Sequence, residues 1–122
     1  MLVVRTYIAP SKIEGFGLFA AEPILHGHIV WIEDPVFDMI LTQAQVDTMP
    51  PIARDYIEKY SWTDRQGLHH IGIDADKYTN HSYNPNCGPI DISTMVALRD
   101  ISIGEEITED YTKYDEYLPV TP

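Results

Sequence analysis

The sequence predicts a mainly β domain of the α+β class, with several short strands and a small helical insert. Three observations support this class: short β-branched segments lie between Gly and Pro residues, a glycine-containing motif occurs twice, and helical periodicity is confined to about residues 42–62. At 122 residues and 13.9 kDa, we expect one domain over residues 1–122 with a short tail at 112–122.

The first element expected is a strand over residues 2–8, because the segment is rich in apolar and β-branched side chains. Ala9-Pro10-Ser11 then predicts a turn. Gly15 and Gly17 stand on either side of Phe16, so the backbone there can take conformations that other residues avoid.

The repeated motif has a glycine three residues after an isoleucine. It occurs as Ile24-Leu25-His26-Gly27 and again as Ile101-Ser102-Ile103-Gly104, and an apolar segment follows each copy. Such spacing predicts a tight turn that needs a glycine conformation, followed by strands at residues 28–32 and 107–110. Two copies are too few for a solenoid.

A helix-start pattern opens the insert. Thr42 is placed as an N-cap with Gln45 three residues later, and this predicts a helix over residues 41–49. A second helix is expected over residues 51–60. Its apolar and aromatic side chains recur at helical spacing and predict one core-facing side made of Ile52, Tyr56, Ile57 and Tyr60.

The rest of the chain predicts short elements. We expect a loop at residues 63–70, a brief strand at 71–73 and another strand at 92–98.

The net charge of −11 and the pI near 4.6 disfavour direct nucleic-acid binding, which needs clustered Lys and Arg. A basic protein partner is the better match for an acidic surface. The single cysteine, Cys87, offers neither an internal disulfide nor a thiolate zinc cluster. No leader or membrane-spanning run is recognised, so we expect a soluble, intracellular protein, placed in the cytoplasm and not at a membrane.

Two polar segments carry the chemistry-bearing residues. One is Asn80-His81-Ser82-Tyr83-Asn84-Pro85-Asn86-Cys87, and the other is Gly104-Glu105-Glu106-Ile107-Thr108-Glu109-Asp110-Tyr111. Taken alone, the first is equally consistent with a polar turn and with a binding segment.

Together with Gly15-Phe16-Gly17-Leu18-Phe19-Ala20, these segments resemble the SET-domain family of protein-lysine methyltransferases. Asn80, His81, Ser82, Pro85 and Asn86 all match the family pattern, and the resemblance covers nearly the whole chain. It implies a β-clip fold in which the 80–86 segment and the segment of Tyr111 pack in a knot-like crossing. It also implies an S-adenosylmethionine-dependent enzyme that methylates a lysine of a histone, a histone-like protein or another basic protein.

The resemblance implies roles for individual residues. The cofactor-binding residues would be Gly15, Phe16, Gly17, Asn80 and His81. Tyr111 would be the catalytic residue, and the channel for the substrate lysine would be lined by Tyr78, Glu109 and Tyr114. No metal ligand is implied.

Two departures from the family pattern stand out. Glu109 occupies a position where many relatives have Tyr or Phe and which is linked to the number of methyl groups added. The tail at 112–122 lacks the zinc-binding cysteines of many relatives, so Tyr114 and Tyr117, or a second subunit in a homodimer, would cover the cofactor.

Two other hypotheses remain open. The chain could be a SET-like binding module for a basic partner that has lost turnover. It could also be a metal-dependent enzyme, although no recognised ligand spacing is present among His69, His70, Asp74, Asp76 and His81.

Overall fold

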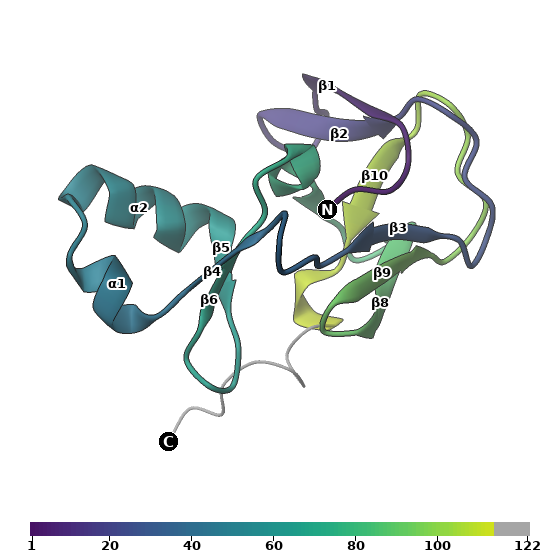
Figure 1. The fold of residues 1–122 in the computed structure, drawn as a ribbon. Helices are drawn as coiled ribbons and strands as arrows, with labels where there is room; N and C mark the ends of the chain where they lie inside the picture. The colour runs from purple at the N-terminus through teal and green to yellow at the C-terminus, as the bar shows by residue number, and fades with distance from the viewer. Residues whose placement is uncertain (114–122) are drawn as a thin grey trace.

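The computed structural model describes residues 1–113, and Figure 1 shows their arrangement. Within these residues a seven-stranded sheet has the order β1-β2-β10-β8-β9-β3, and β7 also pairs with β10. A three-stranded sheet, β4-β6-β5, belongs to the insert. The strands of the main sheet are β1 (Thr6–Pro10), β2 (Phe16–Ala20), β3 (Ile29–Ile32), β7 (Asn80–His81), β8 (Cys87–Asp91), β9 (Thr94–Ala97) and β10 (Glu106–Glu109).

The insert lies to one side of the main sheet (Figure 1). It consists of β4 (Met39–Leu41), α1 (Gln43–Asp47), α2 (Pro51–Tyr60), β5 (Ser61–Thr63) and β6 (His69–Ile71), and a 3₁₀ turn η1 (Ala75–Tyr78) leads back to the main sheet. No helix in the described part of the chain has both the length and the apolar character that crossing a bilayer requires.

Each part has its own apolar core. The main core consists of fully or almost fully buried side chains from the strands and the glycine turns: Leu18, Ala20, Ile24, Val30, Cys87, Met95, Ala97, Ile101 and Ile107. Val46, Ile57 and Ile71 form a separate small core in the insert. Burial of this apolar surface is the main stabilising term, and the insert has much less of it.

The repeated glycine motif forms two turns that pair with each other. Gly27 and Gly104 have φ angles of 86° and 85°, as the sequence predicts. Ile24 and Ile101 exchange two backbone hydrogen bonds, of 2.9 and 2.7 Å, in an antiparallel bridge. The two copies therefore lie side by side at one end of the main core.

The two helices confirm the capping prediction and correct the predicted face. The Thr42 side chain accepts a hydrogen bond from the Gln45 amide, and the Gln45 side chain accepts one from the Thr42 amide. On α2, however, Ile57 is buried whereas Ile52 is 80% exposed and Tyr56 is 43% exposed. The small insert core accommodates only part of the predicted apolar side.

Several strand boundaries also differ from the predictions. The first strand begins at Thr6 and includes Ala9 and Pro10, so the turn lies later, where the Ser11 amide donates to the Gly15 carbonyl. Residues 61–71 form a β5–β6 hairpin instead of a loop followed by a strand at 71–73. Cross-strand pairing decides these boundaries, and local composition carries little information about it.

A buried histidine joins the insert to the main sheet. His70 Nδ1 lies 2.7 Å from a Glu33 carboxylate oxygen, and His70 Nε2 lies 2.7 Å from an Asp64 oxygen. The ring also stacks on Trp62, with a centroid distance of 3.9 Å and an interplanar angle of 7°. Each ring nitrogen of His70 thus faces one carboxylate. Glu33 follows β3, whereas Trp62, Asp64 and His70 belong to the insert hairpin.

We predict that His70→Ala lowers the free energy of unfolding by about 3 kcal/mol, because the change removes the contact of a buried ring with two partly buried carboxylates and with Trp62. His69→Ala is the matched control. Its side chain hydrogen-bonds only within the insert, to Thr63 and Gln43, and we expect a loss of about 1 kcal/mol. Urea unfolding of both variants measures the difference, and equal losses would contradict this role for His70.

The crossing implied by the resemblance is present, and Asn86 fixes it. Both β7 and β8 pair in parallel with β10, so the segment between them passes around that strand. The Asn86 carboxamide is 2% exposed; its Oδ1 accepts from the Thr108 amide at 2.9 Å and its Nδ2 donates to the Glu106 carbonyl at 2.7 Å. The Asn86 side chain thus makes the two backbone hydrogen bonds that a neighbouring strand would otherwise make with β10.

We expect Asn86→Ala to destabilise the domain by about 3 kcal/mol, since it leaves a buried backbone donor and acceptor unpaired. Asn84→Ala, an exposed change in the same turn, should cost less than about 0.5 kcal/mol. Thermal unfolding of the two variants provides the comparison. A small effect of Asn86→Ala would show that water or a local shift replaces its hydrogen bonds.

Candidate functional site

The 3₁₀ turn η1 leads into the site. Asp74 caps this turn, because its Oδ1 accepts from the Asp76 amide at 3.2 Å, and its Oδ2 accepts from the Leu2 amide at 2.8 Å. The chain then continues directly from Thr79 into β7, where Asn80 and His81 pair with Thr108 and Glu109 of β10. The Asn-His pair therefore lies beside the strand that ends next to Tyr111.

Asn80 reaches the glycine turn near the start of the chain. Its Nδ2 lies 3.1 Å from the Glu14 carbonyl oxygen and 3.3 Å from that of Phe16. The same nitrogen lies 3.1 Å from Ser11 Oγ and 3.0 Å from Glu106 Oε2. All four neighbours are acceptors in these contacts, so the amide orientation is well determined: Nδ2 faces the turn and Oδ1 is left over.

The two glycines of this turn serve different purposes. Gly15 has a φ of 50°, and an added Cβ there would meet nothing within 4 Å, so its backbone conformation is the constraint. Gly17 is constrained by space, because an added Cβ would lie 2.5 Å from Glu106 Oε2. Phe16, between them, is 57% exposed.

His81 contacts Tyr111 directly. Its Nδ1 accepts a hydrogen bond from the Tyr111 amide at 3.1 Å, and the two rings are tilted with centroids 5.1 Å apart. Because Nδ1 is the acceptor, the proton of a neutral ring lies on Nε2. Nε2 is buried and has no hydrogen-bond partner among residues 1–113. A ligand with an acceptor at this point would satisfy it.

The Tyr111 hydroxyl donates to the Thr79 carbonyl oxygen at 2.5 Å. Burial, followed by the nearby carboxylates of Glu109 and Glu14, raises the pKa of Tyr111 to about 12. The phenol is therefore neutral at physiological pH, and the lone pairs of its oxygen remain able to accept a hydrogen bond.

The residues predicted to line a substrate channel fall in different places. Glu109 is the register partner of both His81 and Cys87, and its charge acts on Tyr111. Tyr78 instead has its ring 5.4 Å from the Lys77 ammonium, which also contacts Tyr56 of α2. The third member, Tyr114, lies outside the described residues, as does Tyr117.

Three residues of the site were missed by the sequence reasoning: Ser11, Glu106 and Thr79. Ser11 and Glu106 meet the Asn80 side chain, and Thr79 supplies the acceptor for Tyr111. No local sequence signal identifies them. The roles of Ser11 and Glu106 depend on β10 lying beside the 11–17 turn, and that of Thr79 depends on β7 lying beside β10.

The residues of the metal hypothesis are dispersed. His69 bonds to Thr63 and Gln43, His70 to Glu33 and Asp64, and His81 to Tyr111. Across residues 1–113, no group of three or more His, Cys, Asp or Glu side chains is arranged to hold a metal ion.

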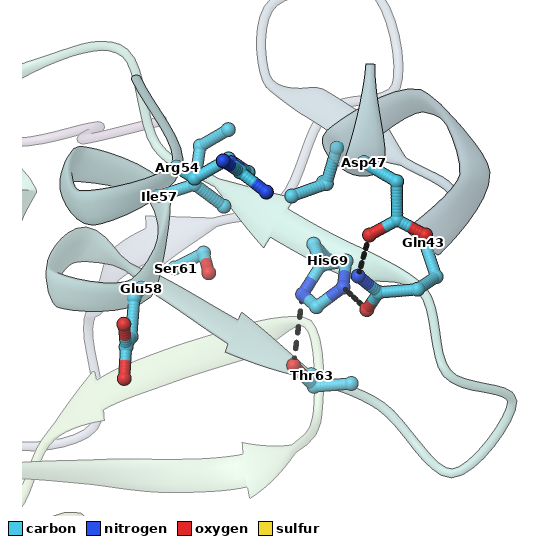
Figure 2. A pocket seen from close by; sticks show the side chains of 9 residues that line it. Gln43, Asp47, Arg54, Ile57, Glu58, Ser61, Thr63 and His69 are labelled. Carbon is cyan, nitrogen blue, oxygen red and sulfur yellow. Dashed lines mark hydrogen bonds between the residues drawn. The ribbon is translucent and has the colours of Figure 1, made fainter. Parts of the chain in front are cut away.

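A pocket of about 410 Å³ lies in the insert, apart from the Asn80–Tyr111 site. Figure 2 shows His69 between Gln43 and Thr63, with Gln43 also donating to Asp47. Arg54 and Ser61 face the same space from α2 and β5 (Figure 2). Four of the polar side chains that line this pocket, those of Gln43, Asp47, Thr63 and His69, are therefore hydrogen-bonded to one another.

A family comparison agrees with the site. The model of the SET domain matches residues 15–112. The chain therefore belongs to the SET-domain family.

The sequence identity to individual proteins is low. The chain is 31% identical over 130 residues to the histone-lysine N-methyltransferase trr of Drosophila melanogaster, and the match covers 91% of this chain but only 5% of that protein. A Plasmodium falciparum protein described as a histone methyltransferase shares the fold, with a TM-score of 0.65, 20% identity, and coverage of 88% of this chain and 93% of that chain. A chain of the Chaetomium thermophilum Polycomb Repressive Complex 2, bound to S-adenosylmethionine in an autoinhibited conformation, has a TM-score of 0.69 and 22% identity, with coverage of 96% of this chain and 16% of that chain.

The residues present fit the cofactor that this family uses. In the 15–17 turn the Gly15 and Phe16 carbonyls already accept from the Ser11 amide and from Asn80 Nδ2. Asn80 Oδ1, by contrast, has no hydrogen bond to residues 1–113, and His81 Nε2 is a buried donor that also has no partner there. S-adenosylmethionine carries an ammonium group and acceptor nitrogens that match these groups in kind.

Two carboxyls, those of Asp74 and Asp76, lie close together on the turn that leads into the site. Burial, and then the hydrogen bond to and repulsion from Asp74, raises the pKa of Asp76 to about 8. Since this folded-state pKa lies above the unfolded value of 3.8, the folded protein binds the extra proton between these values. Stability from this group is full below about pH 4 and is lost as pH rises to about 8.

We expect Asp76→Asn to remove this dependence of the free energy of unfolding on pH. For one titrating group the dependence is about 1.4 kcal/mol per pH unit at most. The Asn amide donates permanently to Asp74, so the variant should be relatively more stable than the parent at pH 9 than at pH 5. Urea unfolding at several pH values measures this. Parallel pH profiles for the two proteins would show that Asp76 does not hold the proton.

Proposed function

We propose that this domain transfers the methyl group of S-adenosylmethionine to a lysine side chain of a protein substrate. One observation carries the proposal: residues far apart in the sequence meet at one site. Asn80 contacts the carbonyls of the glycine turn, and His81, the next residue, accepts from the Tyr111 amide. Family membership gives this arrangement its chemical interpretation.

The cofactor would supply an already activated methyl group on a sulfonium, so little covalent chemistry is left to the protein. The 15–17 turn, Asn80 and His81 would hold it, the last two through the unpaired Asn80 Oδ1 and His81 Nε2. Positioning the two reactants then provides most of the rate enhancement.

Tyr111 would orient the amine. Its hydroxyl proton is directed to the Thr79 carbonyl, so its oxygen would accept an N–H of the incoming lysine. The amine must be neutral to attack, and burial beside a positive sulfur lowers a lysine pKa from its usual value of about 10.4.

The substrate would be a basic protein or peptide. Glu14 and Glu109 act electrostatically on Tyr111, and the whole chain carries a net charge of −11. Such a field attracts a cationic segment, and the attraction weakens with salt. Histones and other basic proteins belong to this class, and the insert between residues 42 and 70 would contribute to the choice among them.

The test combines purified protein, methyl-labelled S-adenosylmethionine and a histone mixture. We expect labelled lysine, and Tyr111→Phe should lower the rate about 100-fold because the hydroxyl that orients the amine is lost. Tyr83→Phe is the matched control, since Tyr83 also packs on His81 but is 82% exposed, and its rate should stay within about twofold. Absence of label on any lysine in the parent would refute the proposed activity.

A second candidate is a SET-like binding module without turnover. Glu109 favours it, because a carboxylate beside Tyr111 would hold a lysine in its unreactive ammonium form. Calorimetry with S-adenosylhomocysteine and with a histone peptide separates the candidates: an enzyme should bind both, whereas a module of this kind needs only the peptide.

A further inference from the structure

A carboxylate beneath the glycine turn has no assigned role. Glu106 accepts from the Ser11 hydroxyl, at 2.8 Å through Oε1 and 2.9 Å through Oε2, and from Asn80 Nδ2 at 3.0 Å. Ser11 also closes the turn, because its Oγ accepts from the Ile13 amide at 2.9 Å. The last strand, the early turn and β7 therefore meet at one partly buried carboxylate.

The space for this carboxylate exists because residue 17 is glycine. An added Cβ at Gly17 would lie 2.5 Å from Glu106 Oε2 and 2.8 Å from its carboxyl carbon. Ser11 and Asn80 hold the carboxylate, so it cannot move aside without breaking hydrogen bonds. The bare face of Gly17 is thus turned toward Glu106.

Glu106 also limits how the Asn80 amide can lie. In the observed orientation both hydrogens of Nδ2 find acceptors, whereas a flipped amide would place Oδ1 against the carboxylate and two carbonyl oxygens. Oδ1, which has no partner in residues 1–113, is consequently the atom presented to a ligand.

We propose that Glu106, held by Ser11, is a positioning residue that fixes Asn80 Oδ1 as an acceptor for the cofactor's α-ammonium group and places a negative charge behind it. The inference rests on the proposed function. It assigns to Glu106 a role in binding the amino-acid half of the cofactor and none in binding its adenosine half.

The test measures binding, and turnover is not needed. Calorimetry is carried out with S-adenosylhomocysteine and with 5′-methylthioadenosine, which lacks the amino-acid part. We expect Glu106→Gln to weaken S-adenosylhomocysteine about tenfold and to change 5′-methylthioadenosine less than about twofold. Ser11→Ala should shift binding in the same direction, and Ser11→Thr, which keeps the hydroxyl, should restore it.

Glu58→Gln controls for net charge, because Glu58 is an exposed carboxylate of the insert, and we expect both ligands to bind as in the parent. Thermal unfolding verifies that each variant is folded. If Glu106→Gln does not fold, the comparison of Ser11→Ala with Ser11→Thr decides the question.

The outcomes separate the two proposals. If the parent binds neither ligand, the proposed function fails. If the parent binds both and the Glu106 and Ser11 variants weaken both equally, or weaken neither, the positioning role is overturned while the proposed function stands.

Discussion

The arrangement of the site depends on one buried carboxamide. Asn86 accepts a hydrogen bond from the Thr108 amide and donates one to the Glu106 carbonyl, at the point where the chain passes around β10. Its own carbonyl accepts from Leu98, so the same residue also connects to the end of β9. Because buried backbone groups need partners, this residue permits a crossing that would otherwise leave β10 unsatisfied, and the crossing brings the Asn-His pair next to Tyr111.

Negative charge is the second organising feature. Glu14, Glu106 and Glu109 all act near the proposed site, and two of them affect Tyr111. Neighbouring carboxylates repel one another unless hydrogen bonds or cations compensate them. Ser11 and Asn80 compensate Glu106 within the protein. A cationic group bound beside Tyr111, as proposed above, would lie in the field of Glu14 and Glu109.

Much of the fold was accessible from the sequence, although not its boundaries. The capping box at Thr42 and Gln45 and the two glycine turns are local features, so local rules predict them correctly. The exposure of Ile52 and the β5–β6 hairpin depend on what lies across the sheet or helix, which periodicity does not report. For the candidate site, the motif resemblance predicted Asn80, His81 and Tyr111, which the fold brings together. Ser11, Glu106 and Thr79 became apparent only through their contacts with these residues.

The attachment of the insert bears on how such proteins diversify. The chain leaves the main sheet after β3 and returns at Asp74, and both ends are anchored near Leu2, which bridges to Trp31 and donates to Asp74. The segment between these anchors has its own small core. It contacts the rest of the domain through His70 and Glu33, through Lys77 and Tyr56, and through the pairing of Asp38 with the Met1 ammonium group. Changes confined to this module do not involve the pairing of β7 and β8 with β10, so the insert can vary in length and sequence while the strand register beside Asn80 and Tyr111 is kept.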